Sequence, residues 1–130
     1  TGSGLSGTSH HSVEADNARY WNGAASGNWT YNIRYNSSTT LDSKMSNGEM
    51  ICVTYITPVG GSSYYQTGFT IDGSSKTVQW VDNIAPVQGG GRESGDDAAT
   101  TGYDVYTFAI NKYSSNNYYI LGSHTHFGSF

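Results

Sequence analysis

The sequence predicts an all-β protein, specifically an antiparallel β-sandwich of jelly-roll type with an extended N-terminal arm. Residues Trp29–Tyr35 alternate strictly between large apolar and polar side chains, which is typical of a half-buried strand. No segment after Trp29 has the period of a helix of about ten residues, and turn-forming residues recur about every ten positions. At 130 residues the chain has the size of one domain.

The arm is predicted over residues 1–28, and the sandwich over residues 29–130. The first segment is rich in Gly, Ser, Ala and Asn and has little hydrophobic periodicity. Trp21 is its exception, because a large aromatic side chain in a polar segment usually packs against something. We expect Trp21 to contact either the domain itself or a neighbouring subunit.

Six strands follow from the patterns of apolar residues and turns. The segment Glu49–Thr57 is apolar on both faces, which predicts a central strand covered on both sides and a buried thiol at Cys52. Asp72 and Gly73 form a strong turn signal. The predicted strands are Trp29–Tyr35, Glu49–Thr57, Tyr64–Ile71, Thr77–Trp80 and a terminal hairpin of Tyr103–Lys112 and Tyr118–Phe127.

A long loop is predicted from Val81 to about Gly102. It contains the flexible run Gly89–Gly91 and a small acidic group. Loops of this length are often functional or contact another subunit.

The composition argues against several classes of partner. Only 12% of residues are charged, the formal net charge is −4, and no Lys/Arg cluster provides a basic surface for nucleic acid. No run approaches the roughly 20 apolar residues of a membrane span. The surface implied by the many Ser, Thr, Asn and Tyr residues suits packing against copies of the same chain, or contact with neutral sugars.

No catalytic site is expected. The ten acidic residues lie mostly beside Gly, Ser or Asn in predicted turns, and no pair has a spacing that singles it out for acid–base chemistry. The chain has no nucleophile elbow and no phosphate-binding loop. Its one cysteine, Cys52, cannot form an intrachain disulfide. We therefore expect neither catalysis nor a resident cofactor.

His124 and His126 are the candidate metal ligands. Residues two apart on a strand project to the same side, but two ligands do not complete a site. Three copies around a threefold axis would bring six imidazole nitrogens together. The alternative is a pair of surface histidines at a sheet edge.

Three tyrosines are candidate glycan contacts, since sugars stack on exposed aromatic rings. Neighbouring strand residues face opposite ways, so one ring of each Tyr-Tyr pair should point outward. The candidates are Tyr64, Tyr65 and Tyr119.

Several segments, in this order, resemble a β-module of tailed-bacteriophage structural proteins, of the tail-fibre or appendage type found in marine and cyanobacterial phages. The resemblance runs from about Asn28 to the C-terminus and departs from the family pattern in the turn between Trp80 and Pro86. It is carried by Trp29–Arg34, Ser37–Ser43, Gly48–Thr54, Tyr64–Tyr65 with Phe69–Gly73, Val78–Trp80, Tyr103–Phe108 and Tyr119–Phe127.

The resemblance implies a non-enzymatic structural component of the virion that assembles as a homo-oligomer. We expect the chain to form a homotrimer and to contact other virion proteins. A host surface glycan is expected as a further partner. A metal ion is expected only on the threefold axis. The expected subunit contacts are Trp21, Tyr118 and Phe127.

Three other functions stay open from the residues alone. A capsid decoration protein and a subunit of an extracellular filament, joined by strand or arm exchange, are also structural roles. A carbohydrate-binding module belongs to a different class and would use the exposed tyrosines.

Overall fold

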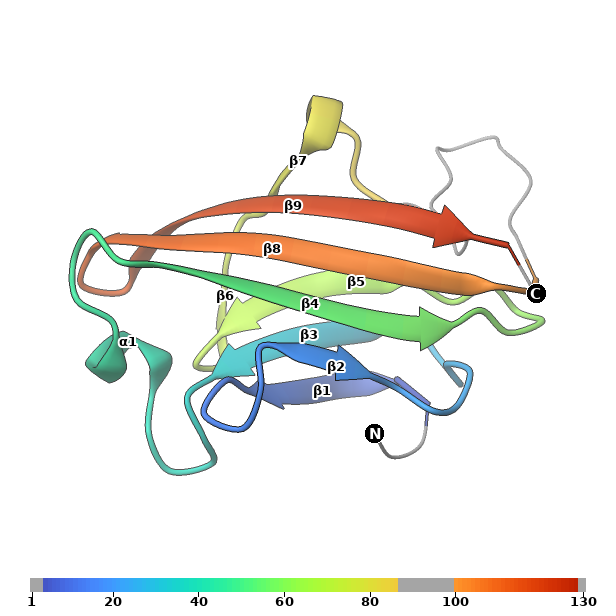
Figure 1. The fold of residues 1–130 in the computed structure, drawn as a ribbon, viewed down its shortest axis with the longest axis horizontal. Helices are drawn as coiled ribbons and strands as arrows, with labels where there is room; N and C mark the ends of the chain where they lie inside the picture. The colour runs from blue at the N-terminus through green and yellow to red at the C-terminus, as the bar shows by residue number, and fades with distance from the viewer. Residues whose placement is uncertain (1–3, 87–99, 129–130) are drawn as a thin grey trace.

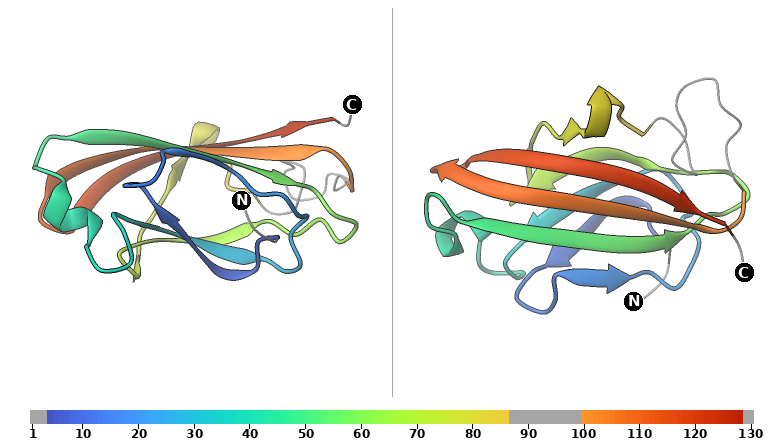
Figure 2. Two further views of the ribbon diagram at one scale, coloured as in Figure 1. Left: turned by 60° about the horizontal axis from the view of Figure 1, so that its bottom comes forward. Right: turned by 45° about the horizontal axis from the view of Figure 1, so that its top comes forward.

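The computed structural model describes residues 4–86 and 100–128, which form two β-sheets with almost no helix (Figure 1). The all-β prediction is therefore confirmed. The first sheet has the strand order β1-β3-β5-β6 and the second has the order β2-β4-β8-β9-β7. Figure 2 shows the sheets as separate layers. The first sheet comprises β1 (Gly7–Ser12), β3 (Trp29–Arg34), β5 (Gln66–Ile71) and β6 (Ser74–Ser75); the second comprises β2 (Ala18–Tyr20), β4 (Met50–Pro58), β8 (Tyr103–Ser114), β9 (Asn117–Phe127) and β7 (Gln79–Trp80).

The strictly antiparallel arrangement predicted from the sequence is wrong. Within the described residues, β1 pairs with β3, β3 with β5, β2 with β4 and β7 with β9 in parallel. The pairs β4–β8, β8–β9 and β5–β6 are antiparallel. From β1 to β5 the chain changes sheet at every connection, so each strand lies beside the strand two before it, which runs the same way. Turn-forming residues in the sequence indicate where the chain reverses direction, but they do not indicate that it crosses to the other sheet.

The segment predicted as an N-terminal arm belongs to the sheets of its own chain. Residues 7–12 form an edge strand on β3, and residues 18–20 form one on β4. Leu5 and His11 are completely buried. Strand β1 is rich in Ser and His, and β2 has only three residues, so neither shows the apolar alternation that marks β3 in the sequence.

The core lies between the sheets and is dominated by aromatic rings. Tyr31 stacks on Tyr55 at 3.9 Å, Tyr55 on Tyr106 at 4.9 Å, and Tyr106 on the ring of His124 at 4.1 Å. Three of these rings are register partners across β4, β8 and β9. A continuous column of rings thus spans the interior and joins Tyr31 of the first sheet to His124 of the second.

The predicted strands and turns are largely confirmed. The buried alternation of β3 and the long β8–β9 hairpin appear as expected. Asp72 and Gly73 have φ angles of 52° and 83°, which suit the two-residue hairpin turn between β5 and β6. The predicted loop after Val81 begins with the short 3-10 helix η1 (Val81–Asn83), and its Gly89–Gly91 run lies outside the described residues.

The prediction that β4 is covered on both sides is wrong. β4 is central in its sheet, between β2 and β8. Val53 and Tyr55 are buried, but Met50 and Cys52 on the other face are exposed. An apolar outer face produced the same uninterrupted run that a doubly covered strand would show.

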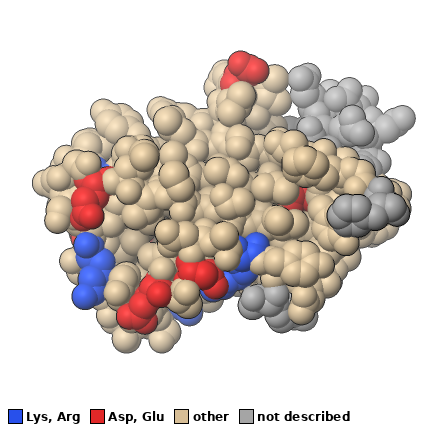
Figure 3. All heavy atoms as spheres, viewed as in Figure 1, with Lys and Arg blue, Asp and Glu red and all other residues tan. Residues whose placement is uncertain are grey.

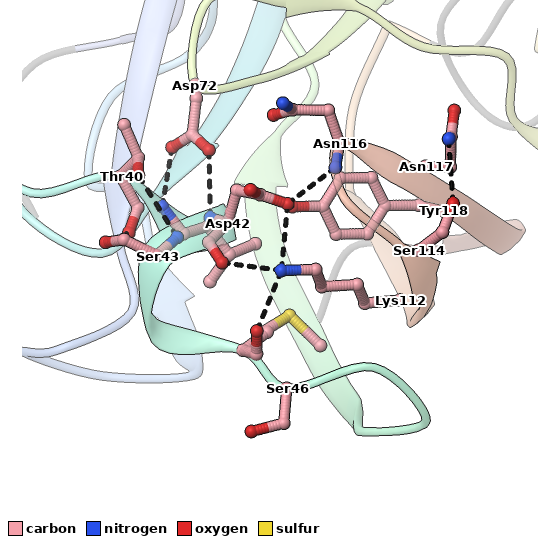
Figure 4. A network of polar contacts seen from close by, with 12 residues as sticks. Thr40, Asp42, Ser43, Ser46, Asp72, Lys112, Ser114, Asn116, Asn117 and Tyr118 are labelled. Atoms are coloured by element: carbon pink, nitrogen blue, oxygen red, sulfur yellow. Dashed lines mark hydrogen bonds and ion pairs between the residues drawn. The ribbon is translucent and has the colours of Figure 1, made fainter.

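A polar network attaches the short helix α1 (Leu41–Lys44) to the β8–β9 hairpin (Figure 4). Buried Lys112 lies 3.0 Å from the carboxylate of Asp42 and donates to the carbonyls of Asp42 and Met45. The Asp72 carboxylate accepts from the first N–H groups of α1, at 2.7 and 3.1 Å. This network closes the end of the molecule where β8 turns into β9.

Candidate functional site: the outer face of the second sheet

Each long strand of the second sheet has an inward side and an outward side. Tyr106, Phe108 and Ile110 of β8 are fully buried, as is Ile120 of β9. The alternate residues point away from the core and together form the outer face of the second sheet. On β4, β8 and β9 this face consists of Met50, Cys52, Thr54, Ile56 and Pro58; Tyr103, Val105, Thr107, Ala109, Asn111 and Tyr113; and Tyr119, Leu121, Ser123, Thr125 and Phe127.

The outer face has no charged side chain on β4, β8 or β9 and is largely apolar. None of the residues just named is Asp, Glu, Lys or Arg. Figure 3 shows charged side chains mainly along the margins of this view, and mostly uncharged atoms over the strands. Most of the large apolar side chains found exposed in the described residues belong to this face, and their exposed fractions run from 45% to 57%: Tyr20, Met50, Tyr113, Tyr119, Leu121 and Phe127.

The two ends of the face have different shapes. At the open end of the hairpin lies an apolar groove of about 600 Å³ lined by Tyr20, Ile56, Val105 and Phe127. At the turn end, Tyr113 and Tyr119 stack on each other with ring centres 4.4 Å apart. We call these features the apolar groove and the tyrosine pair.

The outer face of the first sheet is polar and internally hydrogen bonded. Its central residue, Asn32, is buried and accepts from the Thr70 hydroxyl at 2.6 Å and from the Gly73 N–H at 2.9 Å. The Asn32 amide nitrogen also lies 3.0 Å from a ring nitrogen of His10. The two outer faces therefore differ sharply, and of the two only that of the second sheet presents an extended apolar surface within the described residues.

The candidate metal ligands His124 and His126 project to the same side, as expected, but that side is the interior. His126 Nδ1 lies 2.9 Å from one oxygen of the buried Asp104 carboxylate, and His124 Nε2 lies 3.2 Å from the other. His124 Nδ1 is buried without a hydrogen-bond partner among the described residues. A shared site on a threefold axis would require these rings to turn outward.

Within residues 4–86 and 100–128, no group of three or more His, Cys, Asp or Glu side chains is placed to hold a metal ion. In the same residues no helix is long and apolar enough to cross a membrane.

Two of the expected subunit contacts are engaged within their own chain. The Trp21 indole N–H donates to the Tyr31 hydroxyl at 3.4 Å, and its ring packs against the core. The Tyr118 hydroxyl donates to Asp42 at 3.2 Å. Phe127 is about half exposed and lines the apolar groove, so it is the one of the three placed for an intermolecular contact.

The three candidate glycan tyrosines lie in different surroundings. Tyr64 packs against the core. Tyr65 lines a cleft of about 320 Å³ beside β5, together with Gln66, Lys76 and Trp80. Tyr119 points outward while Tyr118 points inward, which confirms the prediction for that pair.

Sequence reasoning missed the outer face as a unit, although its signal was present. Every second residue of β8 from Tyr103 to Tyr113 is uncharged, and the same holds for β9 from Tyr119 to Phe127. Only the register shows that these positions face solvent side by side.

No family model, curated protein or solved structure matches the chain.

Proposed function

We propose that the chain is a non-enzymatic structural module whose copies assemble with one another through the outer face of the second sheet. One observation carries this proposal: the sheet presents a broad, largely apolar surface without a charged residue at any outward position of β4, β8 and β9. Large exposed apolar patches on soluble domains mark interaction sites. An uncharged face lets like copies meet without electrostatic repulsion.

The setting we propose comes from the sequence resemblance: a tail fibre or appendage of a tailed-phage virion, with other virion proteins and a host surface glycan as further partners. The homotrimer implied by that resemblance stays a prediction; the twofold pair proposed below is an alternative to it, since a threefold ring uses a different type of contact. We also propose that the two sheets are the layers of a β-sandwich, a rigid body suited to a structural part. The aromatic core between the sheets supports this assignment.

The mass of the whole chain in solution tests self-assembly. Light scattering over a wide range of concentration should give masses above the 14.0 kDa of one chain. Electron microscopy of the same sample would separate closed oligomers from fibres. A 14.0 kDa particle at every concentration would contradict the proposal.

A second candidate function, glycan binding, is favoured by the cleft beside β5. Tyr65 and Trp80 supply aromatic rings, and Thr67 and Lys76 supply polar groups, which is the combination that sugar sites use. Glycan-array binding that is lost in Trp80→Ala and kept in Tyr119→Ala would support this function. Binding that depends on Tyr119 instead would place it on the outer face.

A further inference from the structure

We propose that two copies of this chain pair face to face through the outer face of the second sheet, with the tyrosine pair of each copy seated in the apolar groove of the other. This inference rests on the proposed self-assembly and names its geometry. The occupant of the groove is a second copy of the same chain.

The groove has the character of a site for an aromatic side chain. Its lining comes from three neighbouring strands and is almost entirely carbon: Ile56 of β4, Val105 of β8 and Phe127 of β9, closed at one side by Tyr20. Its volume of about 600 Å³ exceeds what one ring needs. Grooves of this kind bind aromatic anchors at protein interfaces.

The tyrosine pair has the complementary character. Tyr113 and Tyr119 are 50% and 54% exposed, yet they are ordered against each other by stacking. Rigid tyrosines provide large contact area at a small cost in conformational entropy. Because each ring already constrains the other, part of that cost is met before association.

The spacing of the two features allows both contacts to form at once. Tyr103 and Tyr113 lie at opposite ends of β8, ten residues apart, which is about 33 Å along a strand. A twofold axis lying in the interface and crossing the strands would place the turn end of one hairpin over the open end of the other. Each copy then contributes one groove and one tyrosine pair, as an isologous interface requires.

The size and charge of the face suit such a pair. Three long strands with short flanking strands cover on the order of 600 Å² in projection at ordinary strand spacings, and a standard interface buries about 800 Å² of accessible surface per partner. The centre of the face is rich in hydroxyl groups, with Thr54 and Thr107 in mutual contact at 3.3 Å. These groups can pair across an interface without burying a charge.

Two single variants test the contact from its two sides. Tyr119→Lys places a charge in the tyrosine pair, and Val105→Glu places one in the groove. Each substitution should weaken association about tenfold or more. In a symmetric pair both copies carry the substitution, so two new charges are buried. Thr8→Lys, at an exposed position on the first sheet, is the matched control and should leave the mass unchanged.

Mixing the two variants tests the reciprocal geometry. In a mixed pair, the lysine introduced by Tyr119→Lys in one copy meets the glutamate introduced by Val105→Glu in the other. The second groove and the second tyrosine pair keep their native residues. Association should therefore be stronger in the mixture than in either variant alone, as measured by light scattering at equal total concentration. Association that stays as weak as in the separate variants would overturn the reciprocal contact.

The single thiol provides a measurement on the unchanged protein. Cys52 is exposed on the outer face, so labelling by a maleimide should slow as concentration rises and the face becomes covered. A mass of 28.0 kDa, twice 14.0 kDa, with protected Cys52 supports the inference. A larger oligomer that keeps Cys52 reactive and is indifferent to Tyr119→Lys overturns the inference and leaves self-assembly standing. A monomer throughout overturns both.

Discussion

His11 illustrates how a residue without any sequence signal becomes structurally decisive. Its ring is fully buried. The Nε2–H group donates to the Asp16 carbonyl at 3.0 Å, so Nδ1 accepts from the Tyr31 hydroxyl at 2.7 Å. Burial lowers the pKa of His11 despite the favourable contacts with Asp16. The imidazole is therefore held neutral at one end of the aromatic column.

The lowered pKa of His11 predicts a pH dependence of stability. In the unfolded chain His11 binds a proton near pH 6.5, whereas in the folded chain it does so only at lower pH. The stabilisation is thus present above about pH 6.5 and is lost as the pH falls through the folded pKa. Urea unfolding at neutral and mildly acidic pH should show this loss.

The variant His11→Gln is the control for that measurement. It should be less stable at neutral pH but lose less stability on acidification than the unchanged chain. Equal slopes for the two proteins would show that His11 is not responsible.

Among the elements, α1 owes its attachment to the hairpin to Lys112 and its neighbours. Burial by itself would raise the pKa of Asp42, but hydrogen bonds from Asn116, Lys112 and Tyr118 outweigh this effect and lower that pKa. Helix α1 is too short to be stable by itself. Its position therefore follows from these contacts and from burial of Leu41.

Replacing Lys112 by alanine should destabilise the fold by about 2–4 kcal/mol, because the Asp42 carboxylate loses its cation and the carbonyls of Asp42 and Met45 lose their donor. The matched control is Lys44→Ala. Lys44 is exposed, and its cation–π contact with Tyr35, at 5.0 Å, lies in solvent, so its loss should cost less than about 1 kcal/mol. Chemical denaturation measures both, and similar costs would refute the assigned role of the Lys112 network.

The edge strand β7 depends on the absence of a side chain at Gly122. A Cβ atom there would lie 2.6 Å from Val78 and 3.1 Å from the Trp80 ring. Gly122→Ala should therefore displace β7, cost about 1–3 kcal/mol and change the tryptophan emission. Gly61→Ala has open space around it and should do neither; an unchanged emission in Gly122→Ala would argue against this packing.

Over the whole molecule, charge distribution separates the two outer faces. An interface without charged residues should respond weakly to ionic screening. Association should change little between about 0.05 and 0.5 M sodium chloride and should strengthen in sodium sulfate, which favours apolar burial. Sedimentation in these salts provides the measurement, and marked dissociation by sodium chloride would point to a charged interface elsewhere.

Local sequence patterns were sufficient for the elements whose signal lies in neighbouring residues. Alternation marked β3 and the terminal hairpin, and Asp72 with Gly73 marked the turn between β5 and β6. The sequence also predicted that one tyrosine of the pair Tyr118–Tyr119 points outward. It missed the polar strand β1 and the three-residue strand β2, which are stable as strands only because β3 and β4 offer edges to pair with.

Long-range contacts settled which face of each strand meets solvent. The same apolar run in β4 fits a buried strand or an exposed interface, and the register with β8 resolves this by placing Cys52 outside and Tyr55 inside. Likewise, two histidines on the same side of β9 could face solvent or the core. His124 and His126 face the core, where both contact the buried Asp104 carboxylate. Sequence patterns report periodicity, whereas the direction of a side chain relative to the core depends on contacts between residues far apart in the chain.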